Sequence, residues 1–181
     1  MKYNLILTIL LLVSCQSSKL TPDQATGKLG EKPYFEIDGE AVSQDQLQDY
    51  NPNEIAALTS YFDKEAVKLY CEKAKDGAVI IETKKYATNK YIAFFKESSN
   101  AYRELVESTD NNNIQYILND RVLTEDFEGD LSSINKKLLI KIEVLDQETL
   151  LEKYQINDKK VGVSITSKRP RNLYNSKEKF K

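Results

Sequence analysis

The side chains with the strongest nucleophilic chemistry in this chain are two thiols, Cys15 and Cys71. The 181 residues include no histidine, which excludes Ser-His-Asp triads, Cys-His pairs and histidine-ligated zinc. Carboxylates are spread along a chain that is 30% charged, so no pair stands out as the two acids of a glycosidase. The residue types therefore predict a protein that is not an enzyme, with no catalytic residues, no cofactor and no metal.

Cys71 admits two interpretations. Three lysines nearby in the sequence (Lys68, Lys73, Lys75) would favour a reactive thiolate, but no imidazole is present to take its proton. We expect instead a half-buried small side chain with a structural role. If Cys15 is modified, Cys71 has no partner left in the chain, which excludes an internal disulfide.

Two charged segments have the composition of binding elements. Residues 125–130 (EDFEGD) carry carboxylates that suit Ca²⁺, but they lack the alternating ligands of a calcium loop, so we expect a solvated insertion. Residues 168–181 hold six basic residues and one acidic residue, a net charge of +5 (6 − 1). This basic tail (residues 169–181) either contacts anionic headgroups or an acidic partner, or is a disordered solubilising segment. The whole chain has a net charge of −2 with both signs interspersed, which disfavours nucleic acid as a partner.

The N-terminus has the organisation of a bacterial export signal. Lys2 precedes an apolar run over residues 5–13, which is too short to span a bilayer, for which about 20 residues are needed. The run leads into Leu12-Val13-Ser14-Cys15, which resembles the lipobox of bacterial lipoproteins.

This resemblance implies that residues 1–14 are a removed signal peptide and that Cys15 carries the lipid. Anchoring needs several acyl chains of the palmitate type, because each buried CH₂ contributes only about 0.8 kcal/mol. Residues 15–32 are then the lipidated cysteine and a flexible tether, since they are rich in Ser, Thr, Pro and Gly. Gln16 favours the outer membrane, because it is not the aspartate that retains some lipoproteins at the inner membrane.

The remaining chain contains one module twice, at residues 33–85 and 114–168. From Leu47 onward the two copies match at a constant offset of 84, and the earlier offset of 81 slips within residues 124–130. The matched pairs include Val67 and Leu151, Tyr70 and Tyr154, Val79 and Val163, Ile81 and Ile165, and Lys84 and Lys168.

The two copies predict the same elements, in the order β-β-α-β-α-β. Residues 55–62 alone would suit a helix, but their counterpart 139–145 alternates apolar and charged residues with a period of two, so we interpret both as strands. Residues 79–81 and 163–165 should lie on equivalent strands. The fold class is α/β, in the form of two tandem α+β two-layer units.

A helical linker at residues 86–113 joins the modules. Apolar residues between Thr88 and Ser108 fall on one helical face, with a break near residues 98–100. We expect this linker to pack against both modules and to join their cores.

The first module resembles the plug domain of TonB-dependent outer-membrane receptors, in its short Bacteroidetes-type form. The resemblance rests on Ile37-Asp38-Gly39, on Asn51-Pro52 followed by Ile55, on Leu69-Tyr70, and on Lys75-Asp76-Gly77 followed by Val79-Ile80-Ile81 and Thr83-Lys84. The glycine that follows Leu-Tyr in that family is Cys71 here and Gln155 in the second copy. If that position needs a positive φ, the turn must be rebuilt in both copies.

The resemblance implies the fold and membership of an envelope complex, but no transport by this chain alone, because a receptor's β-barrel is not part of it. We therefore expect a non-enzymatic, outer-membrane-associated lipoprotein, facing the periplasm or the cell surface, that binds a β-barrel or another envelope lipoprotein. The alternative is an accessory lipoprotein for a small ligand or glycan, which the 11 tyrosines permit.

Overall fold

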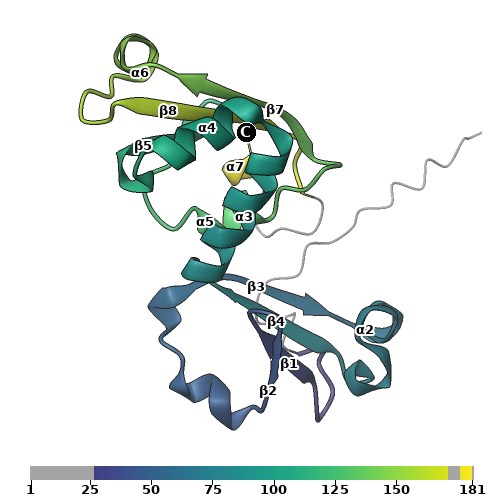
Figure 1. Cartoon of the computed structure of the whole chain (residues 1–181). Coiled ribbons are helices and arrows are strands. Elements are labelled where there is room, and N and C mark those ends of the chain that lie inside the picture. Colours follow the sequence, from purple (N-terminus) through teal and green to yellow (C-terminus); the bar gives the residue numbers. More distant parts are fainter. Residues whose placement is uncertain (1–26, 171–175, 181) are drawn as a thin grey trace, which may run out of the picture.

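The structure is a computed structural model that describes residues 27–170 and 176–180. The signal peptide, Cys15 and most of the expected tether lie outside the described residues. The described chain folds into two four-stranded mixed sheets, each with helices packed against it (Figure 1). The expected fold class, two α+β two-layer modules in tandem, is confirmed.

The first module contains four strands in the order β2-β1-β4-β3, with β1 and β4 parallel and the other pairs antiparallel. Its elements are β1 (Tyr34–Ile37), β2 (Glu40–Val42), the 3₁₀ helices η1 (Asp45–Asp49) and η2 (Pro52–Glu54), β3 (Ile55–Tyr61), α2 (Asp63–Tyr70), the 3₁₀ helix η3 (Cys71–Ala74) and β4 (Ala78–Thr83).

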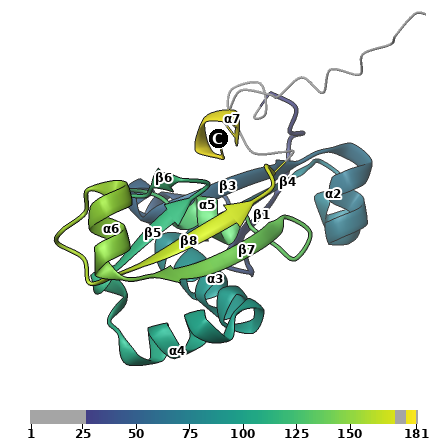
Figure 2. The same cartoon turned by 90° about the horizontal axis from the view of Figure 1, so that it is seen from above.

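The second module repeats this order as β6-β5-β8-β7. Its elements are a 3₁₀ turn η4 (Asn111–Asn113), β5 (Ile114–Leu118), β6 (Arg121–Val122), α5 (Glu128–Ser132), β7 (Leu139–Leu145), α6 (Gln147–Tyr154) and β8 (Val161–Ser167). The second helices of the two modules, α2 and α6, lie on opposite sides of the molecule (Figure 2).

The α-helix expected after β2 is wrong, because η1 and η2 take its place. Ser43 does cap this segment, since its hydroxyl accepts the N–H of Gln46 at 3.3 Å. The turn cannot lengthen, because Pro52 has no N–H to donate and the Asn51 side chain takes the N–H of Asn53 at 3.0 Å.

The strand registers confirm the offset of 84. Leu58 lies opposite Ile81 in the first sheet, and the equivalent Ile142 lies opposite Ile165 in the second. Both outer strands also carry the same register irregularity, between Ile55 and Ala57 and between Leu139 and Lys141. Residues 79–81 and 163–165 therefore occupy equivalent strands, as expected.

Each module closes its first hairpin against the end of its last strand with one side chain. The Asp38 carboxylate accepts the Thr83 N–H and hydroxyl, both at 2.7 Å. Asn119 does the same with its amide, accepting the Ser167 N–H at 2.9 Å and donating to the Ser167 carbonyl oxygen at 3.0 Å. Asp and Asn suit this place because each tolerates the positive φ of the turn, 53° at Asp38 and 49° at Asn119.

The linker forms two helices, α3 (Lys84–Ser98) and α4 (Asn100–Ser108). They break at Ser99, as expected, because its hydroxyl accepts the N–H of Tyr102 at 3.3 Å and so caps the second helix. Helix α3 begins at the residue after β4, two residues earlier than the linker boundary predicted from the sequence.

The linker packs against both modules, as expected, because α3 contacts β3 and β4 as well as α5, but the expectation that it joins the two cores is wrong. Its buried aromatic residues, Tyr91, Phe95 and Tyr102, belong to one cluster with the second sheet. The first module keeps two small cores of its own, around Val79 and around Ala66. The reason is that α3 and α4 both direct their aromatic side chains toward β5 and β8 of the second sheet.

The basic tail ends in a docked segment. Helix α7 (Ser176–Lys179) leads to Phe180, which is 1% exposed and packs in the core of the second module. Arg169 donates to the Phe180 carbonyl oxygen at 2.8 Å. Disorder is therefore the wrong description for residues 176–180, while residues 171–175 lie outside the described part.

Two helix ends require a left-handed backbone that glycine would adopt more easily. Cys71 ends α2 with φ 59° and ψ −164°, and Gln155 ends α6 with φ 60° and ψ 32°. The turn is thus not rebuilt in either copy; the non-glycine residues adopt the positive φ. Cys71 is also exposed, so the expectation of a half-buried side chain is wrong.

Replacing Cys71 with glycine should raise the free energy of unfolding by about 1 kcal/mol, because φ and ψ at Cys71 fall in a region that is costly for any residue with a Cβ. Gln155→Gly should stabilise the protein less, because the αL conformation of Gln155 costs a residue with a Cβ less free energy than the conformation of Cys71 does. Urea unfolding followed by circular dichroism measures both. Cys71→Ala keeps the Cβ and should be neutral; if it stabilises as much as glycine, backbone strain is not the cause.

Candidate functional site

A cleft of about 760 Å³ lies between the two modules. One wall is a face of the first sheet, where Glu36, Thr59 and Ile80 are aligned across β1, β3 and β4. The other wall consists of α5 and the loop after it, with Lys90 and Phe94 of α3 and Lys179 of the tail completing the lining. The cleft is thus built from both copies of the repeat and from the linker.

The two walls meet where α5 touches the edge of the first sheet. Gly129 of α5 lies so close to β3 that an added Cβ would overlap the Ala56 carbonyl oxygen and lie 2.9 Å from its carbon. Residues 125–130 are therefore only in part a solvated insertion: Glu125 and Asp126 are exposed, but Gly129 and Asp130 are buried. The inserted residues form a contact between the modules, which corrects the expectation from the sequence.

A polar bridge crosses the cleft beside this contact. The Ser132 hydroxyl of α5 donates to the Glu82 carboxylate of β4 at 2.9 Å. Glu82 also pairs with the Lys90 ammonium of α3. Glu82 is therefore held from two sides, by the other module and by the linker.

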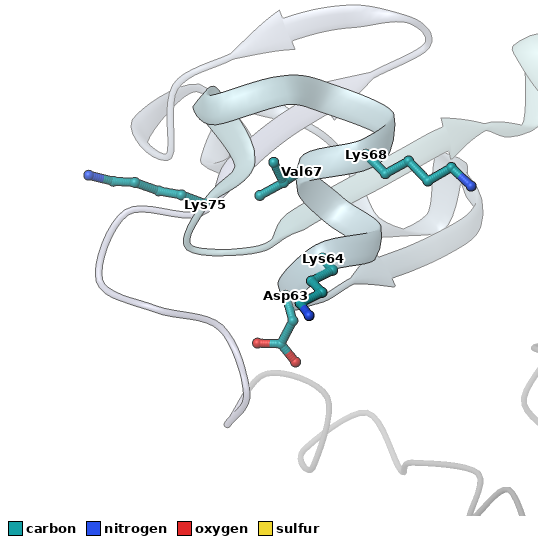
Figure 3. Close-up of a pocket in the computed structure, with 5 residues that line it drawn as sticks. All are labelled: Asp63, Lys64, Val67, Lys68 and Lys75. Carbon is teal, nitrogen blue, oxygen red and sulfur yellow. The ribbon is translucent and has the colours of Figure 1, made fainter.

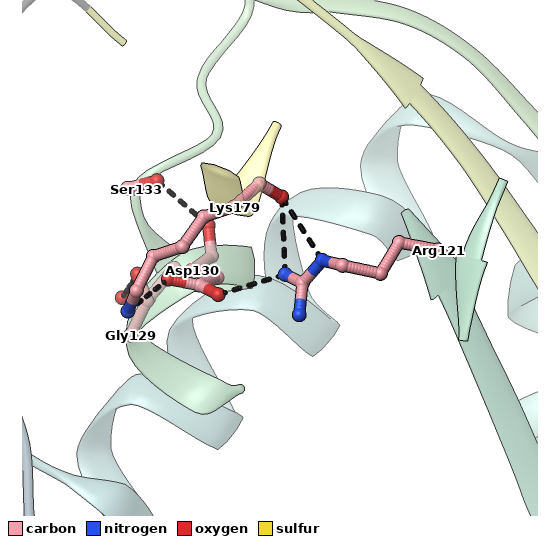
Figure 4. A network of polar contacts seen from close by, with 6 residues as sticks. Arg121, Gly129, Asp130, Ser133 and Lys179 are labelled. Atoms are coloured by element: carbon pink, nitrogen blue, oxygen red, sulfur yellow. Dashed lines mark hydrogen bonds and ion pairs between the residues drawn. The ribbon is translucent and has the colours of Figure 1, made fainter. Parts of the chain in front are cut away.

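A second polar network joins Asp130 of α5 to Arg121 of β6 and to Lys179 of the tail (Figure 4), and Asp130 and Lys179 also line the cleft. The Asp130 side chain is only 4% exposed and accepts from Arg121 at 3.1 Å and from the Lys179 ammonium at 2.8 Å. Arg121 also donates to the Lys179 carbonyl oxygen, at 3.0 and 3.2 Å. A carboxylate this buried needs such partners, so the network fastens the tail to the second module.

One end of the cleft is aromatic. The Tyr70 ring lies 5.4 Å from that of Tyr34 and 5.8 Å from that of Tyr61, measured between centroids. The Tyr34 hydroxyl donates to the Glu36 carboxylate at 2.9 Å. Burial, and then the nearby charge of Glu36, raise the pKa of Tyr70 to about 12, so its phenol stays neutral at every physiological pH.

A shallower depression lies on α2, lined by Val67, Asp63 and the lysines Lys64, Lys68 and Lys75 (Figure 3). The Lys68 and Lys75 side chains point away from Val67 in opposite directions, so no polar groups converge there. This depression lacks the arrangement of a specific site.

The hydroxyls and charged groups in and around the cleft bond to one another. Tyr34 and Ser132 donate to the carboxylates of Glu36 and Glu82, and the ammonium groups of Lys90 and Lys179 pair with Glu82 and Asp130. Within residues 27–170 and 176–180, no group of three or more metal-ligating side chains comes together.

The sequence named only Cys15 as a site residue, and Cys15 lies outside the described residues. The cleft residues were missed, although one signal was present: Glu36 and Glu82 are charged positions inside otherwise apolar strands. Their meeting with Ser132 and Tyr70 depends on contacts between distant segments, which the spacing of residues does not encode.

Among the described residues, no helix has the length and apolar character needed to cross a membrane. Comparison with known proteins gives no match to a family model, to a curated protein or to a solved structure.

Proposed function

We propose that this chain is a lipid-anchored, outer-membrane-associated protein that works by binding another envelope protein and not by catalysis. The observation that carries the proposal is that one long edge strand, β7, has no strand paired with its outer side in the described part of the chain. Strand β7 is seven residues long, and within residues 27–170 and 176–180 its only strand partner is β8. Helix α4 packs against β7, but no described strand pairs with its outer edge, which can therefore accept a further strand.

The other three edges are less suited to pairing. Strands β2 and β6 contain only three and two residues, and α5 lies against β3 at Ala56. Short or covered edges are the usual protection against unwanted pairing. Strand β7 exposes two apolar side chains, Ile140 at 59% and Val144 at 38%, and β3 exposes one, Leu58 at 60%. A partner strand on the β7 edge would gain backbone hydrogen bonds and apolar contacts together.

The resemblance of the first module to receptor plug domains supports a partner in the outer membrane, either a β-barrel or an associated lipoprotein. An acylated Cys15 would keep the protein at that membrane. Confinement of this kind raises the effective concentration of neighbouring proteins, so even a weak edge contact would be occupied.

Photo-crosslinking in intact cells tests this proposal. A photoreactive residue at Ile140 should form a reproducible adduct with one envelope protein. The same residue at Leu69, which is exposed to a similar fraction on α2 of the first module, should not. Equal capture at both positions, or no capture together with turnover of a substrate by the purified chain, would contradict the proposal.

Cys15→Ala should abolish acylation and leave the signal peptide uncleaved, because the thiol is the group that accepts the lipid. Intact mass of the membrane-extracted protein measures both effects, with the acyl increment and the loss of residues 1–14 expected in the parent and absent from Cys15→Ala. Cys71→Ala is the matched control and should be processed normally. An acylated Cys15→Ala protein would overturn the assignment.

A further inference from the structure

We propose that the aromatic end of the cleft, formed by Tyr61, Tyr70 and Glu36, binds a small organic cation such as an alkylammonium or guanidinium group. This site is separate from the β7 edge, and its test does not depend on the protein partner.

The aromatic wall has the geometry that attracts cations. Tyr34, Tyr61 and Tyr70 form a row of tilted rings, and Tyr61 and Tyr70 line the cleft. The Lys73 ammonium already lies 4.1 Å from the centroid of the Tyr34 ring. The row therefore holds one cation of the protein itself, and a ring face with this quadrupole favours a positive group within about 6 Å.

Glu36 supplies the complementary charge. The other two carboxylates that line the cleft are neutralised, Glu82 by Lys90 and Asp130 by Lys179 and Arg121. Glu36 forms no ion pair within the described residues, and its only side-chain hydrogen bond there comes from the Tyr34 hydroxyl. That bond fixes one carboxylate oxygen and leaves the other free to accept from a ligand.

The protonation of the two phenols is consistent with a negative potential at this end. Burial raises the pKa of Tyr61, and Glu65, Glu82 and Glu36 add to the effect. Burial penalises a charge of either sign, so only the part of the shift that comes from these carboxylates favours a bound cation.

The shape limits the class of ligand. A volume of about 760 Å³ is within the usual range for small-molecule sites, and Ile80 and Phe94 give it an apolar floor beyond the charged group. An ammonium or guanidinium ion with a short hydrocarbon part could pair with Glu36, lie against the tyrosine rings and place its hydrocarbon part on Ile80 and Phe94. A neutral sugar would use the rings but would leave the Glu36 charge without a counter-ion.

The test is a titration of the full chain in non-ionic detergent, followed by backbone amide shifts in nitrogen-15 spectra. The probes are n-butylammonium chloride, n-butanol and sodium butyrate, at one ionic strength. We expect saturable shifts at Glu36, Tyr61 and Tyr70 with butylammonium alone. Butanol shifts of equal size would show a merely apolar cleft, and no shift with any probe would show no site; either result overturns the proposal.

Variants identify the groups responsible. Glu36→Gln keeps the shape and should weaken butylammonium binding about fivefold, whereas Glu40→Gln, an exposed residue on β2, should leave it unchanged. Tyr70→Leu should weaken it roughly threefold, and Tyr70→Phe, which keeps the ring, should not. Unchanged binding in both Glu36→Gln and Tyr70→Leu would refute the assignment of the site.

Discussion

Replacing Phe180 with alanine should lower the free energy of unfolding by about 3 kcal/mol, the lower part of the range for a large buried aromatic residue. Phe180 is almost fully buried among the core residues of the second module. The loss stays near this lower value because the short segment 176–180 can undock by itself, and the fold then loses only the free energy of docking. Urea unfolding followed by circular dichroism measures the change.

The matched control is Glu178→Ala, an exposed position in the same segment, which should change the stability by less than about 0.5 kcal/mol. Removing residues 176–181 should cost at least as much as Phe180→Ala, because Asp130 then also loses Lys179 and keeps only Arg121 as an ionic partner. If this truncation leaves the urea midpoint unchanged, the tail does not contribute to the fold.

Gly129→Ala should destabilise the protein by about 2–3 kcal/mol, the usual cost of forcing extra volume into a packed contact. The added Cβ would be rigidly attached to the backbone of α5, and it would overlap the backbone carbonyl of Ala56 in β3. Neither can move without displacing α5 from the first sheet. We therefore expect large amide shifts at Ala56 and Ser132 as well as a lower urea midpoint.

Gly162→Ala is the informative comparison, because its Cβ would also meet a neighbour at short distance, 2.6 Å from a terminal methyl of Leu150. A side-chain end can rotate away, so this variant should cost roughly 1 kcal/mol. Equal losses in the two variants would show that the close approach of α5 to β3 is not what makes Gly129 necessary.

The repeat made much of the fold predictable. Residues 55–61 were ambiguous alone, and their counterpart 139–145 identified them as a strand because its alternation has a period of two. The constant offset also predicted the equivalence of β4 and β8, which have the same neighbours and register. Periodicity works here because a strand that buries one face must place its apolar side chains on alternate positions.

The candidate site was not predictable in the same way. Residues 125–130 have the composition of an exposed loop, yet Gly129 and Asp130 are buried because α5 packs against the other module. Phe180 lies in a segment whose charge suggested a solvated tail. Burying this one aromatic side chain in the core of the second module is enough to dock the segment in spite of its charge. Both cases depend on contacts between segments distant in sequence, for which the local pattern carries no signal.

The direct passage of β4 into α3 has a consequence for the order in which the chain acquires structure. The first sheet is complete once Thr83 has emerged, but the helix that covers its β3 edge is not present until Gly129, 46 residues later (129 − 83). During that interval the nascent protein presents an open sheet edge and an uncovered strand face, the features that favour aggregation. A chaperone that holds the early-emerging half should therefore improve the yield of correctly assembled protein.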